Sequence, residues 1–167
     1  PVHFGAKIYT GNGSTNAISG FGFRPDWIVL KNRSNSASNT MSSSNLGRGG
    51  VLYLNGTSQL APSPAGTDVA SYDSDGFTLG TNNNGNINTN GDDYVAWCWQ
   101  GDSGNTSTNS NGTITSTVQV NSAAGFSSLT YTGNATGNQT IGHGLSAAPE
   151  LILIKSYTDG TVGWLVF

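Results

Sequence analysis

The carboxylates of this chain that could do chemistry gather in two short stretches. Asp73 and Asp75 are one residue apart and precede a glycine, and Asp92 and Asp93 are adjacent further along the chain. Calcium prefers several oxygen ligands brought together by a tight turn. The spacing therefore predicts a calcium site formed by these four aspartates. The alternative, which we favour, is that the chain has no cofactor and the aspartates bind turn amides next to a strand at 77–79.

Aromatic and amide side chains in the expected loops are candidates for carbohydrate binding. Tyr72 stands next to the first acidic stretch, and an asparagine-rich tract at 82–90 contains Asn82, Asn84 and Asn86. Sugar sites combine an apolar surface with a few polar groups, and loops on rigid scaffolds often carry them. We therefore take these four residues as candidate carbohydrate-binding residues. The simpler explanation for the tract is that it solvates one end of the fold.

Residue types that catalyse reactions are scarce. Glu150 is the only glutamate, so the two carboxylates that glycoside hydrolysis requires could only come from pairs of aspartates. Cys98 stands between two tryptophans in an apolar run, where a buried and unreactive thiol is expected. His3 and His143 have no Cys, His or acidic residue at the spacing of a metal site or a catalytic triad. We therefore expect no enzymatic activity and assign no catalytic residue.

Half of the chain consists of four small polar residue types. Gly (24), Ser (21), Thr (19) and Asn (19) account for 83 of 167 residues, and all four are poor helix formers. Only 9% of the residues are charged, and the six Lys and Arg leave a net charge of -3. No basic surface for nucleic acid is expected. No apolar run approaches the roughly 20 residues that cross a bilayer, so membrane insertion is not expected either.

The apolar residues come in clusters of strand length that are separated by turn-forming residues. The clusters at 27–30, 94–99 and 151–154 are apolar on both alternating faces, as in central strands that are covered on two sides. Between clusters, five Asn-Gly pairs supply the left-handed residues of tight turns. This pattern predicts an all-β fold, an antiparallel β-sandwich, rather than a disordered chain.

A stretch near the start of the chain occurs a second time. Residues 4–31 align with residues 126–155 after a two-residue insertion, with 11 identities in 28 positions. We therefore predict an internal repeat with an incomplete second copy. The expected organisation is a first sandwich at 1–103, a Ser/Asn/Gly-rich linker at 104–112 and the start of a second repeat at 113–167. Because the sequence ends in an uncapped apolar run, we expect it to be part of a longer polypeptide.

Four segments carry a resemblance to a known family. They are Tyr9 to Gly13, Gly22 to Ser34, Ser71 to Gly80 and Tyr94 to Trp99. Together they resemble a family of duplicated domains in virion proteins of cyanophages and other marine bacteriophages, which are mostly structural or tail-fibre proteins of unknown function. The domain is similar to concanavalin A-like lectin sandwiches. The resemblance thus implies a virion component with a jelly-roll fold, and sugar binding by analogy of fold alone.

We therefore expect a non-enzymatic structural domain on the surface of a bacteriophage particle, in a tail fibre, a head fibre or a capsid decoration. Its expected partners are other virion proteins, further copies of the same chain, with a trimer as the expected oligomer, and host cell-surface glycans. The first alternative is a calcium-dependent, lectin-type carbohydrate-binding module. The second is a polysaccharide-degrading tailspike that uses pairs of aspartates.

Overall fold

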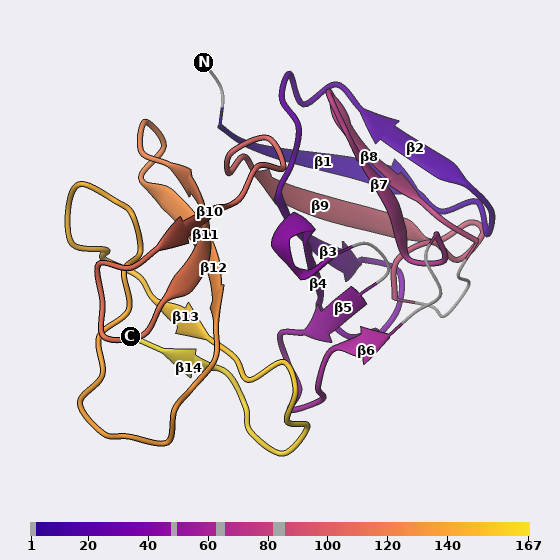
Figure 1. Ribbon diagram of the computed structural model, residues 1–167. Coiled ribbons are helices and arrows are strands. Elements are labelled where there is room, and N and C mark those ends of the chain that lie inside the picture. The colour runs from indigo at the N-terminus through magenta and orange to yellow at the C-terminus, as the bar shows by residue number, and fades with distance from the viewer. Residues whose placement is uncertain (1–2, 48–49, 63–65, 82–85) are drawn as a thin grey trace.

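A computed structural model describes residues 3–47, 50–62, 66–81 and 86–167 (Figure 1). In these ranges the fold is all-β, as expected, and the single helix is the 3-10 turn η1 (Ser44–Leu46). No helix of the described residues is long and apolar enough to span a membrane. The strands are β1 (Phe4–Thr10), β2 (Asn16–Ser19), β3 (Trp27–Asn32), β4 (Thr40–Ser43), β5 (Gly50–Tyr53), β6 (Ala61–Pro62), β7 (Val69–Asp73), β8 (Gly76–Leu79), β9 (Asp93–Trp99), β10 (Ser107–Asn109), β11 (Ser116–Asn121), β12 (Phe126–Tyr131), β13 (Leu153–Ile154) and β14 (Leu165–Val166).

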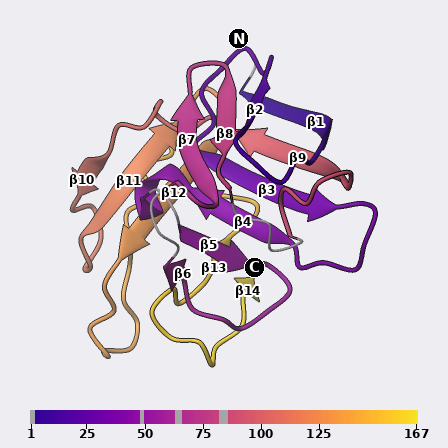
Figure 2. The ribbon, with the colours of Figure 1, turned by 90° about the vertical axis from the view of Figure 1, so that its right-hand side faces the viewer.

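Strands β1 to β9 form two antiparallel sheets that face each other, and we call this unit the first sandwich. The larger sheet has the order β1-β9-β3-β4-β5-β6, and the smaller one has the order β2-β8-β7. In Figure 2 the smaller sheet lies in front of the larger one. Each pair of neighbouring strands is antiparallel. For example, Trp99 of β9 pairs with Phe4 of β1 on one side and with Trp27 of β3 on the other. This arrangement agrees with the β-sandwich expected from the sequence.

The core of the first sandwich follows from the alternation of side chains along its central strands. In β9, Tyr94, Ala96 and Cys98 are fully buried on the same face, and Ala96 and Cys98 share a core cluster with Phe77 and Leu79 of β8. Successive residues of a strand point to opposite faces, so the tryptophans of β9 must point to the outer face of the larger sheet. Val29 and these tryptophans belong to a second apolar cluster, so 27–30 and 94–99 pack against apolar residues on both faces, as expected.

Part of the outer face of the larger sheet is covered by the C-terminal part of the chain, which comprises β10 to β14, while Ile8 of the edge strand β1 stays exposed. Tyr157 and Trp164 pack against the apolar cluster on this face, and the ring of Phe126 lies 6.4 Å from that of Trp27. The indole nitrogen of Trp164 donates a hydrogen bond to the main-chain oxygen of Tyr53 (3.0 Å). Figure 1 shows this part, orange to yellow, beside the first sandwich.

Two sequence expectations differ from the structure of the C-terminal part. The segment 104–112, expected to be a linker, contains β10, whose Ser107 pairs with Val118 of β11. The run 151–154, expected to be a central strand, contributes only the two residues of β13, which pair with β14. Leu151 and Leu153 are 64% and 41% exposed, because no second sheet of the described residues covers them as the smaller sheet covers β3.

Candidate functional site

Asp75 binds main-chain amides from a distant part of the sequence. The carboxylate lies in the turn between β7 and β8 and accepts hydrogen bonds from the amides of Gly20 (2.8 Å) and Gly22 (2.6 Å). These two amides, that of Gly22 foremost, hold the pKa of Asp75 below its usual value. Both glycines have a positive φ, which residues other than glycine rarely adopt, and the carboxylate stabilises the turn that they form. This is amide capping of the kind that we favoured over a metal site.

The other three candidate aspartates differ from this expectation, because their hydrogen bonds come from side chains and not from turn amides. Asp73 Oδ2 accepts one from the hydroxyl of Thr78 (2.7 Å). Asp92 Oδ2 accepts two, from the side-chain amides of Asn32 and Asn35 (2.8 Å each). Asp93 Oδ1 accepts one from a threonine hydroxyl of β1 (3.0 Å). Each carboxylate therefore has a role in joining neighbouring loops and strands.

The two acidic stretches lie at opposite ends of the smaller sheet. Asp75 immediately precedes β8, at the end where β8 pairs with Ser19 of β2. At the other end of β2, Asn16 donates a hydrogen bond to the main-chain oxygen of Thr10 (3.1 Å), and Thr10 pairs with Asp93. A four-residue strand spans roughly 10 Å, which is far beyond the reach of one coordination sphere. Nowhere in the described ranges do three or more His, Cys, Asp or Glu residues group in a way that could hold a metal ion.

Tyr72 is engaged in the structure rather than free in a loop. It belongs to β7, its hydroxyl shares a hydrogen bond with the hydroxyl of Ser42 (2.7 Å), and the guanidinium of Arg24 lies 5.4 Å from its ring centroid. Burial raises the pKa of the phenol. Tyr72 and Arg24 also line a pocket of about 380 Å³ together with Ser44, Gly47 and Ser71. Arg24 thus occupies a position over the ring that a stacked sugar would need.

The asparagine tract is only partly described. Asn82 and Asn84 lie outside the described residues. Asn86 accepts a hydrogen bond from the amide of Ser38 (3.1 Å) and donates one to the hydroxyl of Tyr53 (3.4 Å). The described candidate, Asn86, therefore connects the loop at Ser38 with the end of β5, and it does not line the pocket at Tyr72.

The thiol and the two imidazoles are likewise placed in the fold. Cys98 is fully buried, as expected, and its burial raises the pKa of the thiol. His3 Nδ1 lies 2.8 Å from Oε1 of Gln100. His143 Nδ1 accepts a hydrogen bond from the amide of Leu145 (3.1 Å). The two histidines thus bind nearby polar groups at separate places in the fold.

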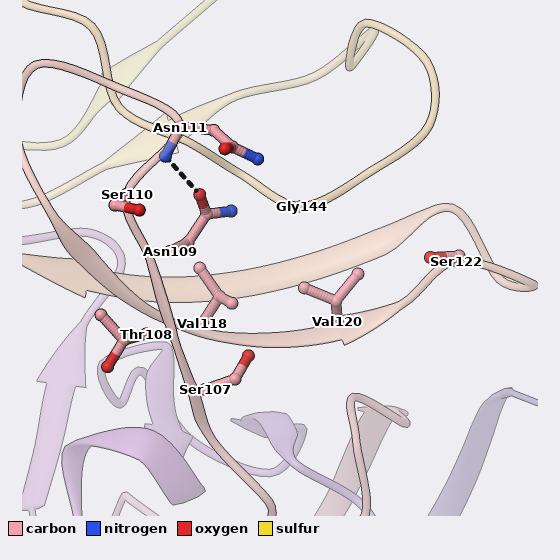
Figure 3. Close-up of a pocket in the computed structure, with 9 residues that line it drawn as sticks. All are labelled: Ser107, Thr108, Asn109, Ser110, Asn111, Val118, Val120, Ser122 and Gly144. Atoms are coloured by element: carbon pink, nitrogen blue, oxygen red, sulfur yellow. Dashed lines mark hydrogen bonds between the residues drawn. The ribbon is translucent and has the colours of Figure 1, made fainter.

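A groove that the sequence did not indicate lies on the C-terminal part, and we call it the β10–β11 groove (Figure 3). Its volume is about 410 Å³. It is lined by Ser107, Thr108, Asn109, Ser110, Asn111, Val118, Val120, Ser122 and Gly144. Val118 lies buried beneath it, Val120 is partly exposed, and most of the other lining residues carry hydroxyl or amide side chains. The sequence did not reveal it because residues 103–111 contain no apolar residue, and a strand without one gives no periodic signal.

Asn109 is held firmly at the edge of this groove. Its Oδ1 accepts a hydrogen bond from the main-chain amide of Asn111 (2.9 Å). A Cβ added at Gly142 would collide with the side-chain amide of Asn109, and one added at Gly144 would lie 2.6 Å from a methyl group of Val120. The groove therefore depends on two glycines whose backbone approaches the asparagine and the valine directly. Gly144 also has a φ of 78°, which favours glycine.

Comparison with known proteins places the chain in a family. A family model described as a domain of unknown function, DUF7483, matches residues 1–167. The search of curated proteins and the search of solved structures gave no significant match.

Proposed function

The chain belongs to the DUF7483 family, and we propose that it is a non-enzymatic structural domain of a bacteriophage virion that adheres to surface glycans. The β10–β11 groove carries this proposal. Its lining is mostly hydroxyl and amide side chains, with Val120 as a partly exposed aliphatic side chain, so it offers several hydrogen bonds and one apolar contact to a ligand with many hydroxyls. A sugar ring is such a ligand. The resemblance to marine phage virion proteins supplies the biological setting.

Exposed apolar side chains support an assembly with further copies or with other virion proteins. Phe4 and Ile8 lie on the same face of the edge strand β1 and are 47% and 71% exposed. Contiguous exposed apolar surface marks interaction sites in folded proteins. A homotrimer would bury such surface on every copy, and trimers suit fibres. The mass of the chain in solution tests this part of the proposal, because a monomer at micromolar concentration contradicts it.

We also propose that the C-terminal part is a partial second copy of a jelly-roll-like first sandwich. Strands β1 and β12 begin at the aligned residues Phe4 and Phe126. After each strand an asparagine side chain accepts a hydrogen bond from the amide two residues on, at Asn12 (2.9 Å) and at Asn134 (3.1 Å). The residue that follows each asparagine has a positive φ, although it is a glycine in the first copy and Ala135 in the second. Shared local geometry at aligned positions supports duplication.

A glycan array probed with the purified chain tests adhesion. Binding to at least one class of surface glycan is expected, and a chelator separates our proposal from the calcium-dependent alternative because only the latter loses binding. Release of reducing ends from a bound polysaccharide would show that the chain is an enzyme. Labelling of intact phage particles with an antibody to the chain tests the virion location, and absence of the chain from purified particles contradicts it.

A further inference from the structure

We infer that the β10–β11 groove recognises a neutral glycan without a metal ion, and that the side-chain amides of Asn109 and Asn111 are its specificity-determining groups. This inference rests on the proposed function, and it adds the site, the ligand class and the residues.

The groove has no charged lining residue, and this favours a neutral ligand. None of its nine lining residues is ionisable, so an acidic sugar would find no cation there to form the charge-assisted hydrogen bonds that hold a carboxylate or a sulfate. The lining also lacks the carboxylates with which lectins bind a sugar through calcium. Recognition must therefore depend on neutral hydrogen bonds and apolar contact.

The size and the lining of the groove suit a sugar ring. Val118 is buried beneath the groove, and Val120 beside it is the partly exposed aliphatic side chain that a ligand can contact (Figure 3). Aliphatic side chains can cover the C–H face of a pyranose, while hydroxyls at the ring edge need polar partners. The volume of about 410 Å³ lies within the range of about 300–1,000 Å³ that is typical of small-molecule sites.

The amide of Asn109 is oriented before any ligand arrives. Its Oδ1 is bound by the amide of Asn111, so its Nδ2 group is the end that faces along the groove towards Gly144 (Figure 3). The side-chain amide of Asn111 is exposed and extends to the same side in this view. Side chains that are already fixed lose less conformational entropy on binding, which raises affinity for a ligand whose hydroxyls match their positions.

The test is an array of neutral and acidic glycans with the intact chain and with the variants Asn109→Ala and Asn111→Ala. Asn134→Ala is the matched control, because Asn134 makes the same side-chain bond to an amide two residues on but lies outside the groove. We expect the wild type to bind neutral glycans with or without chelator. We expect Asn109→Ala to bind about tenfold more weakly, as for the loss of one or two hydrogen bonds, and Asn134→Ala to bind as the wild type does. Circular dichroism shows whether each variant is folded.

Three outcomes overturn the inference, and they differ in what they say of the proposed function. Preferential binding of acidic glycans, weakened by salt, contradicts the ligand class. Neutral binding that Asn109→Ala and Asn111→Ala both leave unchanged contradicts the site, while glycan adhesion itself stands. Failure of the wild type to bind any glycan contradicts adhesion and with it the inference. If Asn109→Ala is misfolded, the glycan affinity of Asn111→Ala tests the site instead, because the exposed side chain of Asn111 can be removed without loss of packing. Weaker binding of neutral glycans by Asn111→Ala is then the expected result.

Discussion

The buried carboxylate of Asp26 forms an ion pair with Arg24 at the junction between the first sandwich and the C-terminal part. Asp26 is 0% exposed and also accepts hydrogen bonds from the hydroxyl of Ser44 (2.8 Å) and the amide of Gly101 (3.0 Å). Ser44 in turn is hydrogen-bonded to the side chain of Gln119, which is 1% exposed. One carboxylate thus connects the end of β9, the turn η1 and β11.

Replacement of Asp26 is expected to destabilise the fold strongly. Removing one partner of a buried ion pair costs about 3–5 kcal/mol, and because Arg24 is 24% exposed we expect the lower half of this range for Asp26→Ala. The measurement is the free energy of unfolding from urea denaturation followed by circular dichroism. Asp102→Ala, at an exposed aspartate next to Gly101, is the control and should change stability by less than about 0.5 kcal/mol. Equal effects of the two substitutions would show that the pair does not hold the junction.

Asp75 should make the stability of the chain depend on pH in the acidic range. Its pKa is lower in the folded protein than in the unfolded chain because the amides of Gly22 and Gly20 bind the ionised form. The contribution of Asp75 to the free energy of unfolding is therefore complete above the pKa of about 4 that it has in the unfolded chain. This contribution is lost as the pH falls through the lower pKa of the folded protein.

The measurement for Asp75 is the melting temperature between pH 2 and pH 7, for the wild type and for Asp75→Asn. We expect the variant to melt at a lower temperature near neutral pH and to show a smaller decrease in acid. Asp102→Asn should keep the wild-type profile. A difference between wild type and Asp75→Asn that stays constant across this pH range would contradict the role given to the two amides.

Removal of divalent metal is expected to leave the chain unchanged. The four candidate aspartates already accept hydrogen bonds, and they lie in two groups at opposite ends of the smaller sheet. We therefore expect the melting temperature to be the same in a chelator and in millimolar calcium. A ligand present at 100 times its dissociation constant would stabilise the fold by about 2.7 kcal/mol, which such a comparison detects easily. A rise with calcium that Asp73→Ala or Asp93→Ala abolishes would restore the calcium site.

The sequence predicts the first sandwich well where burial shapes the strands. Strand β9 lies between β1 and β3, and each of its faces contributes to an apolar cluster. Its apolar sequence therefore predicts its position in the sheet correctly. The run 151–154 has the same apolar pattern, but in the described chain its exposed residues have no such cover. Hydrophobicity in a sequence thus indicates what a segment is suited to contact, and the neighbouring strands decide whether it does.

The candidate site was harder to predict because its partners are distant in sequence. Asp75 binds amides at Gly20 and Gly22, more than 50 positions earlier, and no local spacing records such a contact. Asn109 lies in a polar segment that resembles a linker, and its place at a groove depends on Val118 and on the backbone at Gly142. The same polar residue types occur in turns, caps and binding sites, so their roles can be assigned only when the fold shows which residues they contact.

Docking of the C-terminal part should depend on Trp164. Its indole packs on the outer face of the larger sheet and donates a hydrogen bond to the main-chain oxygen of Tyr53 (3.0 Å). Full burial of a tryptophan is worth about 3–5 kcal/mol, and because Trp164 is only partly buried we expect Trp164→Ala to lower the free energy of unfolding by about 2 kcal/mol. Trp164→Phe keeps an aromatic ring and loses the hydrogen bond, so it should cost about 1 kcal/mol. Urea denaturation followed by circular dichroism measures both, and an unchanged Trp164→Ala would mean that this contact does not hold the C-terminal part on the sheet.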